Sequence, residues 1–104
     1  DGGAFSASVT RELVVDADGY YVFLVESSDK ARLTVSGRRI AEVDGEGDDA
    51  DATIVEPLQR GTYLLRLEGR HPDKDTQVDL QVFRDGDDAD WWRHPVLRLS
   101  DELR

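Results

Sequence analysis

Apolar and polar residues alternate one by one along several stretches of this 104-residue chain. The clearest case is the segment QVDLQVF at residues 77–83, where single polar residues separate Val78, Leu80 and Val82. Successive side chains of a β-strand point to opposite faces of its sheet, so a period of two is typical of strands with one buried face. An amphipathic helix would instead repeat its apolar residues every three or four positions. The alternation therefore predicts an all-β fold.

The same pattern recurs along most of the chain. The segments expected to form strands are residues 20–26, 31–43, 52–58, 60–69 and 77–83, followed by a last apolar patch at 91–99. Ser36-Gly37 divides the second segment and predicts a tight hairpin. Pro57 marks an edge strand or a strand end, since proline has no N–H to donate to a ladder. About seven or eight short strands separated by turn residues predict a two-sheet antiparallel β-sandwich, jelly-roll-like in its connections.

Length and charge restrict the classes of partner. A chain of 104 residues fits one small domain over residues 1–104, with 101–104 as a tail or linker. The 23 acidic residues outnumber the 13 basic ones and give a formal net charge of −10, which repels phosphate backbones, so nucleic acid is not an expected partner. No apolar run approaches the roughly 20 residues that cross a bilayer, and we expect no membrane insertion. The chain contains no cysteine, which excludes disulfides and thiolate sites.

Five short motifs follow one another in a characteristic order. They are a Gly-x-Tyr-x-Phe strand at Gly19, Tyr21 and Phe23, a polar segment with Ser27 and Asp29, a hairpin with Leu33, Val35 and Gly37, a turn with Leu58, Gly61 and Tyr63, and a final strand with Leu80 and Val82. This succession resembles the β-sandwich module named after the anthrax protective antigen, which also occurs in yeast flocculins and attached to bacterial glycosidases. The resemblance covers the chain up to about Phe83.

The resemblance implies a calcium-assisted lectin site. Members of the family that bind sugars hold calcium with two adjacent aspartates, and the ion then contacts the sugar hydroxyls. Here Ser28 stands in place of one aspartate and Asp29 alone remains. Calcium takes about 6 to 8 oxygen ligands, several of them anionic, so this segment needs carboxylates from another loop.

The pentapeptide GDDAD occurs twice, at residues 47–51 and 86–90, and is the candidate source of those carboxylates. Together with Asp29, the candidate metal ligands are Asp48, Asp49, Asp51, Asp87 and Asp88. Neither acidic segment has the spacing of an EF-hand loop. Two interpretations stay open: the segments hold a cation, with calcium as the candidate cofactor, or they are solvated connections that blunt the sheet edges.

The tandem tryptophans next to the second acidic segment are the other candidate binding element. The candidate ligand-binding residues are Asp29, Trp91, Trp92 and Arg93. An exposed indole can stack on the flat face of a sugar while charged neighbours bond to its hydroxyls, and because adjacent residues of a strand face opposite ways, only one indole is expected outside. The alternative is that the outer indole packs against a neighbouring domain. Tyr20, on the expected outer face of residues 20–26, allows the same two interpretations.

Catalytic motifs are not found in the sequence. His71 and His94 are each followed by proline in turn-like segments and belong to no recognisable nucleophile array. We therefore expect a non-catalytic accessory module of a larger exported protein, placed outside the cell, on its surface or in the periplasm. Its expected partners are carbohydrate or polysaccharide, bound through exposed loops, and neighbouring domains of the same polypeptide. The alternative is a structural or protein-interaction spacer that packs against a neighbouring domain and has no ligand of its own.

Overall fold

A computed structural model describes residues 7–44, 50–70, 78–85 and 95–100. These residues form eight β-strands. The strands are β1 (Ala7–Val15), β2 (Gly19–Ser27), β3 (Lys30–Val35), β4 (Arg38–Asp44), β5 (Ala50–Leu58), β6 (Gly61–Gly69), β7 (Val78–Asp85) and β8 (Leu97–Ser100). In this part of the chain no helix is long and apolar enough to cross a membrane.

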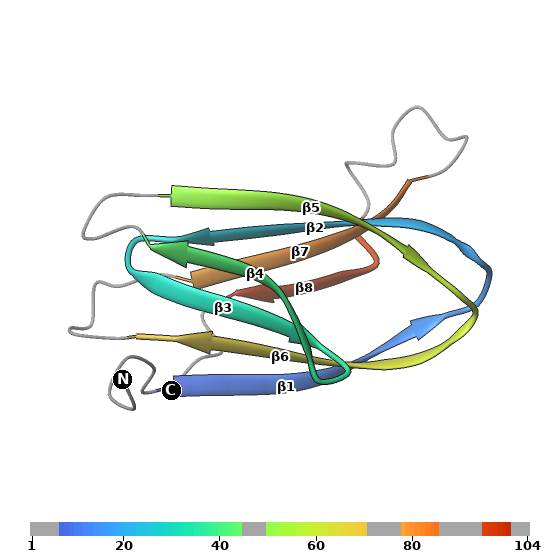
Figure 1. Cartoon of the computed structure of the whole chain (residues 1–104), viewed down its shortest axis with the longest axis horizontal. Coiled ribbons are helices and arrows are strands. Elements are labelled where there is room, and N and C mark those ends of the chain that lie inside the picture. The colour runs from blue at the N-terminus through green and yellow to red at the C-terminus, as the bar shows by residue number, and fades with distance from the viewer. Residues whose placement is uncertain (1–6, 45–49, 71–77, 86–94, 101–104) are drawn as a thin grey trace.

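The strands form two antiparallel sheets of four strands each (Figure 1). Sheet A has the order β1-β6-β3-β4 and sheet B the order β5-β2-β7-β8. Only β3 with β4 and β7 with β8 follow each other within one sheet, and the other connections pass between the sheets, as they do in jelly-roll folds. The prediction of an all-β, two-sheet antiparallel sandwich is confirmed.

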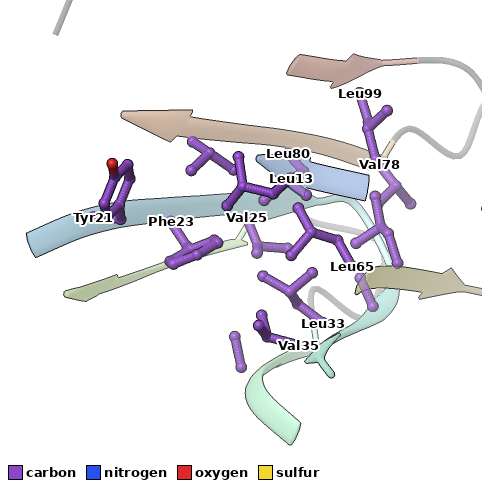
Figure 2. Close-up of a cluster of buried hydrophobic side chains, with 14 of the residues drawn as sticks. Leu13, Tyr21, Phe23, Val25, Leu33, Val35, Leu65, Val78, Leu80 and Leu99 are labelled. Carbon is purple, nitrogen blue, oxygen red and sulfur yellow. The ribbon is translucent and has the colours of Figure 1, made fainter. Parts of the chain in front are cut away.

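The core lies between the two sheets and contains the residues that the alternation assigns to one face. In β2, Tyr21, Phe23 and Val25 are buried, and in β7 the same is true of Val78, Leu80 and Val82. All six belong to one cluster with Leu33 and Leu65 of sheet A, and Figure 2 shows this cluster with every one of them except Val82 labelled. Each fully buried side chain of this size contributes about 1.5–3 kcal/mol to folding, so the inner faces dominate the stability of the sandwich.

The hairpin between β3 and β4 turns at the predicted residues. Ser36 and Gly37 have φ values of 48° and 86°, and a two-residue turn with both central residues at positive φ matches the twist of the flanking strands. The turn is fixed to β6, because the Ser36 N–H donates to the Leu64 carbonyl oxygen at 2.7 Å and the Ser36 hydroxyl accepts from the Leu64 N–H at 3.2 Å.

Strand β4 contains an irregularity that the alternation does not predict. Leu33 pairs with Ala41 but Thr34 pairs with Arg39, so Ile40 is an extra residue in β4. Such a bulge shifts the facing of the strand by one position. Ala41 and Val43 are consequently buried, while Ile40 still packs partly against the core.

Strand β1 is a further element without a sequence prediction. It pairs with β6 over its full length and forms one edge of sheet A. Leu13 and Val15 are buried, but Arg11 lies opposite Leu65 on the same side of the strand and is exposed. A charge on the inner face interrupts the apolar alternation, and this interruption hides the strand in the sequence.

Three carboxylates stand side by side on the outer face of sheet B. Glu26 of β2 pairs with Asp51 of β5 on one side and with Asp79 of β7 on the other. Asp79 is compensated by Arg98, whose Nε lies 3.6 Å from its Oδ1. Like charges directly opposite each other on neighbouring strands are destabilising. Glu26, which lies between two of them, is therefore the least favourable member of the row.

We expect Glu26→Gln to raise the free energy of unfolding by about 0.2–1 kcal/mol, because it removes repulsion from both neighbouring strands. Urea denaturation at low and high salt measures the effect, and the gain should shrink when salt screens the charges. Glu42→Gln is the matched control, since Glu42 is an outward carboxylate of β4 that accepts from Arg39 Nη1 at 3.2 Å. An equal gain in both variants would mean that net charge, and not the row, sets the effect.

Candidate functional site

Asp29 lies in the turn between β2 and β3. It is the one residue that the sequence predicts both as a metal ligand and as a sugar-binding residue. It is 6% exposed. Its Oδ1 accepts a hydrogen bond from the Lys30 N–H at 2.7 Å and another from Arg70 Nη2 at 2.8 Å. The Ser27 hydroxyl accepts from the Asp29 N–H at 3.0 Å. The carboxylate is therefore held by donors of the protein itself.

The surroundings of Asp29 favour its charged form. Burial raises the pKa of the carboxyl, but the Lys30 N–H hydrogen bond, the hydrogen bond and charge of Arg70 and the charge of Lys30 together outweigh burial. The pKa of Asp29 consequently lies below its ordinary value of 3.8. The backbone N–H of Arg70 also donates to the Lys30 carbonyl oxygen at 3.0 Å. This hydrogen bond and the Asp29–Arg70 ion pair together fix the β2–β3 turn to the end of β6.

This geometry supports a structural function for Asp29 better than a metal-binding one. Arg70 already places a positive charge 2.8 Å from Oδ1, which repels a second cation, and the same oxygen accepts two hydrogen bonds. Within the ranges that the structure describes, no group of three or more histidine, cysteine or acidic side chains is arranged to hold a metal ion. Arg70 was not predicted as a partner, because nothing in the segment that follows residues 60–69 marks it.

The other predicted site residues are distributed as follows. Asp51 is exposed on the outer face of β5. The candidates outside the described residues are Asp48, Asp49, Asp87, Asp88, Trp91, Trp92 and Arg93.

The strands to which the two acidic segments connect are anchored at opposite ends of the sandwich. Ala50, where β5 begins, pairs with Ser27 near Asp29, whereas Asp85, where β7 ends, pairs with Tyr20. Strand β2 separates these points by about 23–26 Å, at roughly 3.3 Å per residue. The described residues therefore do not bring Asp29 and the start of the second acidic segment together.

The end of the sandwich that contains Tyr20 has an open pocket of about 560 Å³. Its lining comes from the starts of β2, β4 and β6, the end of β5 and the adjoining turns. The residues of this pocket, called the Tyr20 pocket below, are Asp18, Gly19, Tyr20, Arg38, Pro57, Leu58, Gln59 and Tyr63. The β1–β2 and β5–β6 connections lie at this end of the sandwich (Figure 1).

Two turns of the Tyr20 pocket are tied to each other and to the core. The Arg60 N–H donates to Asp18 Oδ1 at 2.7 Å, which joins the turn before β2 to the turn before β6. The Tyr63 hydroxyl donates to the Gln59 carbonyl oxygen at 2.8 Å and accepts from the Gln59 N–H at 3.0 Å. Because the Tyr63 ring packs against the core, the backbone of Gln59 is held in a fixed position.

Tyr20 is the exposed aromatic residue of the Tyr20 pocket. It is 58% exposed and pairs with Pro57 on β5, so that an aromatic ring and a proline ring occupy directly opposite positions of the outer face. The prediction that Tyr20 faces away from the core is confirmed. An exposed Tyr beside a Pro provides apolar contact area with a polar tip.

Arg38 supplies the charged donor of the Tyr20 pocket. Its Nη2 donates to Glu56 Oε1 at 3.0 Å, and the Arg38 side chain is 68% exposed while that of Glu56 is 17% exposed. The pair joins the first residue of β4 to β5, across the edges of the two sheets. No other hydrogen bond of the Arg38 guanidinium is seen within the described residues, and most of the side chain is accessible to solvent.

Taken together, the lining offers a ring for stacking, a guanidinium, a side-chain amide and a carboxylate. Such a combination suits a polyhydroxylated ligand with an apolar face. Of the residues that supply these groups, the sequence predicts only Tyr20 as a binding residue. Arg38, Pro57 and Gln59 lie in turn or strand-end positions, and in the sequence nothing distinguishes them from other surface residues.

Comparison with models of protein families gives no match, and comparison with curated proteins gives none either. The likeness to the protective-antigen module therefore stays a prediction that depends on the sequence motifs.

We expect Asp29→Asn to lower the free energy of unfolding at neutral pH by about 1–3 kcal/mol, the usual contribution of hydrogen bonds to a charged group. The folded-state pKa of Asp29 is lowered, so its contribution is fully present above 3.8 and is lost as the pH falls through that lowered value. The difference between wild type and variant should therefore vanish in acid, as urea denaturation across a pH series would measure.

The matched control is Asp44→Asn. Asp44 pairs with Lys30 at 3.8 Å, and both side chains are more than one-third exposed. Exposed pairs contribute about 0–1 kcal/mol, so this variant should change the free energy of unfolding little. Equal losses in the two variants would contradict a specific contribution from the Asp29–Arg70 pair.

Proposed function

We propose that the chain is a non-catalytic carbohydrate-binding module of a longer exported protein, and that it binds a sugar ring in the Tyr20 pocket. The observation that supports this most is the exposed Tyr20 ring, which pairs across the strands with Pro57 and belongs to a pocket that Asp18, Arg38 and Gln59 also line. A pyranose has an apolar face of C–H groups and a rim of hydroxyls, and these two features match the ring and the polar residues respectively.

The volume and the rigidity of the Tyr20 pocket favour binding of a small unit. Its 560 Å³ falls in the range of about 300–1,000 Å³ that is usual for small-molecule sites. The hydrogen bonds Asp18–Arg60 and Tyr63–Gln59 fix both turns before any ligand arrives. A preformed site loses less conformational entropy on binding, so even a few contacts give measurable affinity.

The charge of the molecule supports the choice of ligand class and compartment. A net charge of −10 disfavours nucleic acids and anionic membrane surfaces, whereas an uncharged polysaccharide experiences no such repulsion. A module of this kind would act outside the cell, on its surface or in the periplasm, where polysaccharides are found. Binding in the Tyr20 pocket requires no cation, and a role for calcium belongs to the acidic segments that lie outside the described residues.

The test is binding of the chain to a panel of insoluble and soluble polysaccharides, followed by calorimetric titration with oligosaccharides of those that bind. We expect Tyr20→Ala to weaken binding by about tenfold or more, equivalent to at least about 1.4 kcal/mol, because the stacking surface is lost. Tyr20→Phe, which keeps the ring, should retain most of the affinity. Addition of a chelator such as EDTA should leave the affinity unchanged.

Val55→Ala is the matched control for this experiment. Val55 is an exposed apolar residue of the same sheet face at 54% exposure, but it does not line the Tyr20 pocket. Its loss should not alter binding, and neither variant should change the melting temperature by more than a few degrees, since both side chains are largely solvated. Equal affinities of wild type and Tyr20→Ala would place the sugar elsewhere.

A second candidate function is that of a structural spacer that packs on a neighbouring domain. It is favoured by Val14 and Leu64, which are 71% and 52% exposed on the outer face of sheet A. The two residues are diagonal neighbours, because Val14 pairs with Thr62 and Leu64 with Glu12. A ligand that binds only the folded form must raise the melting temperature. If no polysaccharide binds and none raises the melting temperature, the spacer function is the one supported.

A further inference from the structure

We propose that the Tyr20 pocket selects uncharged glycans over acidic ones, and that Glu56 determines this selectivity by engaging Arg38. The inference depends on the proposed carbohydrate-binding function and adds to it the class of glycan. It follows from how one ion pair is placed at the rim of the pocket.

Arg38 is the group on which recognition of an acidic sugar would depend. It is the single cation among the described residues that line the Tyr20 pocket. Guanidinium groups bind carboxylate and sulfate strongly when they present two parallel N–H groups and a full positive charge. Uronic acids and sulfated sugars carry those anions, so their affinity would depend on the state of Arg38.

Glu56 reduces both the number of guanidinium N–H groups that are available and the net positive charge that they present. Its Oε1 accepts from Arg38 Nη2 at 3.0 Å, which occupies one nitrogen of the fork and places a negative charge against the guanidinium. The Glu56 side chain is only 17% exposed and lies mostly within the surrounding structure, whereas the Arg38 side chain is 68% exposed. The remaining guanidinium N–H groups can still donate to a neutral hydroxyl. An anion gains little electrostatic attraction, because the Arg38–Glu56 pair has no net charge.

The other ionisable groups near Tyr20 add negative potential. Asp18 lines the pocket, and Asp85 is the cross-strand neighbour of Tyr20 on β7. Asp16 is paired at 4.0 Å with Arg84, the residue next to Asp85. Two cations also lie close to this set: Arg84, whose Nε is 4.0 Å from where a Cβ on Gly19 would stand, and Arg60, whose backbone N–H donates to Asp18. An acidic sugar that approaches Tyr20 thus meets the carboxylates Asp16, Asp18, Glu56 and Asp85, which outnumber the cations Arg38, Arg60 and Arg84.

The experiment compares Glu56→Gln with wild type on neutral and acidic oligosaccharides of matched length, for example gluco- or manno-oligosaccharides against oligogalacturonates. Wild type should bind the neutral series better. Glu56→Gln should improve binding of the acidic series by about two- to fivefold at low salt, the size expected when one exposed charge interaction is removed. Binding of the neutral series should stay within about twofold of wild type.

Two controls separate this mechanism from general charge effects. Glu42→Gln removes a carboxylate from β4, the strand that carries Arg38, but Glu42 and its partner Arg39 do not line the Tyr20 pocket, so the selectivity should stay unchanged. The double variant Arg38→Gln with Glu56→Gln should lose the improvement for acidic sugars, because no guanidinium remains to bind them.

A measurement on wild type alone keeps the proposal testable if Glu56→Gln folds poorly. Lowering the salt concentration lengthens the range of electrostatic forces, so acidic oligosaccharides should bind more weakly and neutral ones unchanged. The proposal is overturned if acidic sugars bind wild type as tightly as neutral ones, or bind more tightly at low salt. If neither series binds wild type or the variants, the proposed carbohydrate-binding function itself fails, and the selectivity falls with it.

Discussion

Burial of the inner faces of the two sheets is the interaction on which the rest of the molecule depends. Phe23 and Val25 of β2 pack with Leu80 and Val82 of β7 against residues of sheet A such as Leu33 (Figure 2). Because successive residues of a strand face opposite ways, fixing these side chains inward also fixes which side chains point out. Tyr20 reaches solvent for this reason. The position of the candidate site is therefore a consequence of the core.

Much of this arrangement could be predicted from the alternation of apolar residues. The five segments predicted as strands within the described residues form strands whose ends lie within two residues of the expected positions. Where the prediction failed, a local exception broke the period. Arg11 places a charge on the inner side of β1, and Ile40 is inserted into β4 as a bulge. Neither exception can be recognised from the sequence, because the pairing register that shows which face is inward comes only from the structure.

The candidate site was less predictable than the fold, since its parts come from distant positions of the chain. Asp18 meets Arg60 across 42 residues, and Arg38 meets Glu56 across 18. Similarly, the motif resemblance drew attention to Asp29 as a metal ligand, but the partner that defines its chemistry is Arg70, 41 residues away. A motif shows that a carboxylate is present; only the long-range partner shows whether that carboxylate is engaged.

Within the described residues, each of the four strands at the edges of the two sheets is irregular or short. In sheet A, β1 carries the charged Arg11 on its inner side and β4 contains the bulge at Ile40. In sheet B, Pro57 gives β5 one backbone N–H donor fewer, and β8 has only four residues. Each device discourages a foreign strand from extending a sheet. Addition of a strand from a second copy at these edges is thereby disfavoured, although the described residues lie almost entirely in strands.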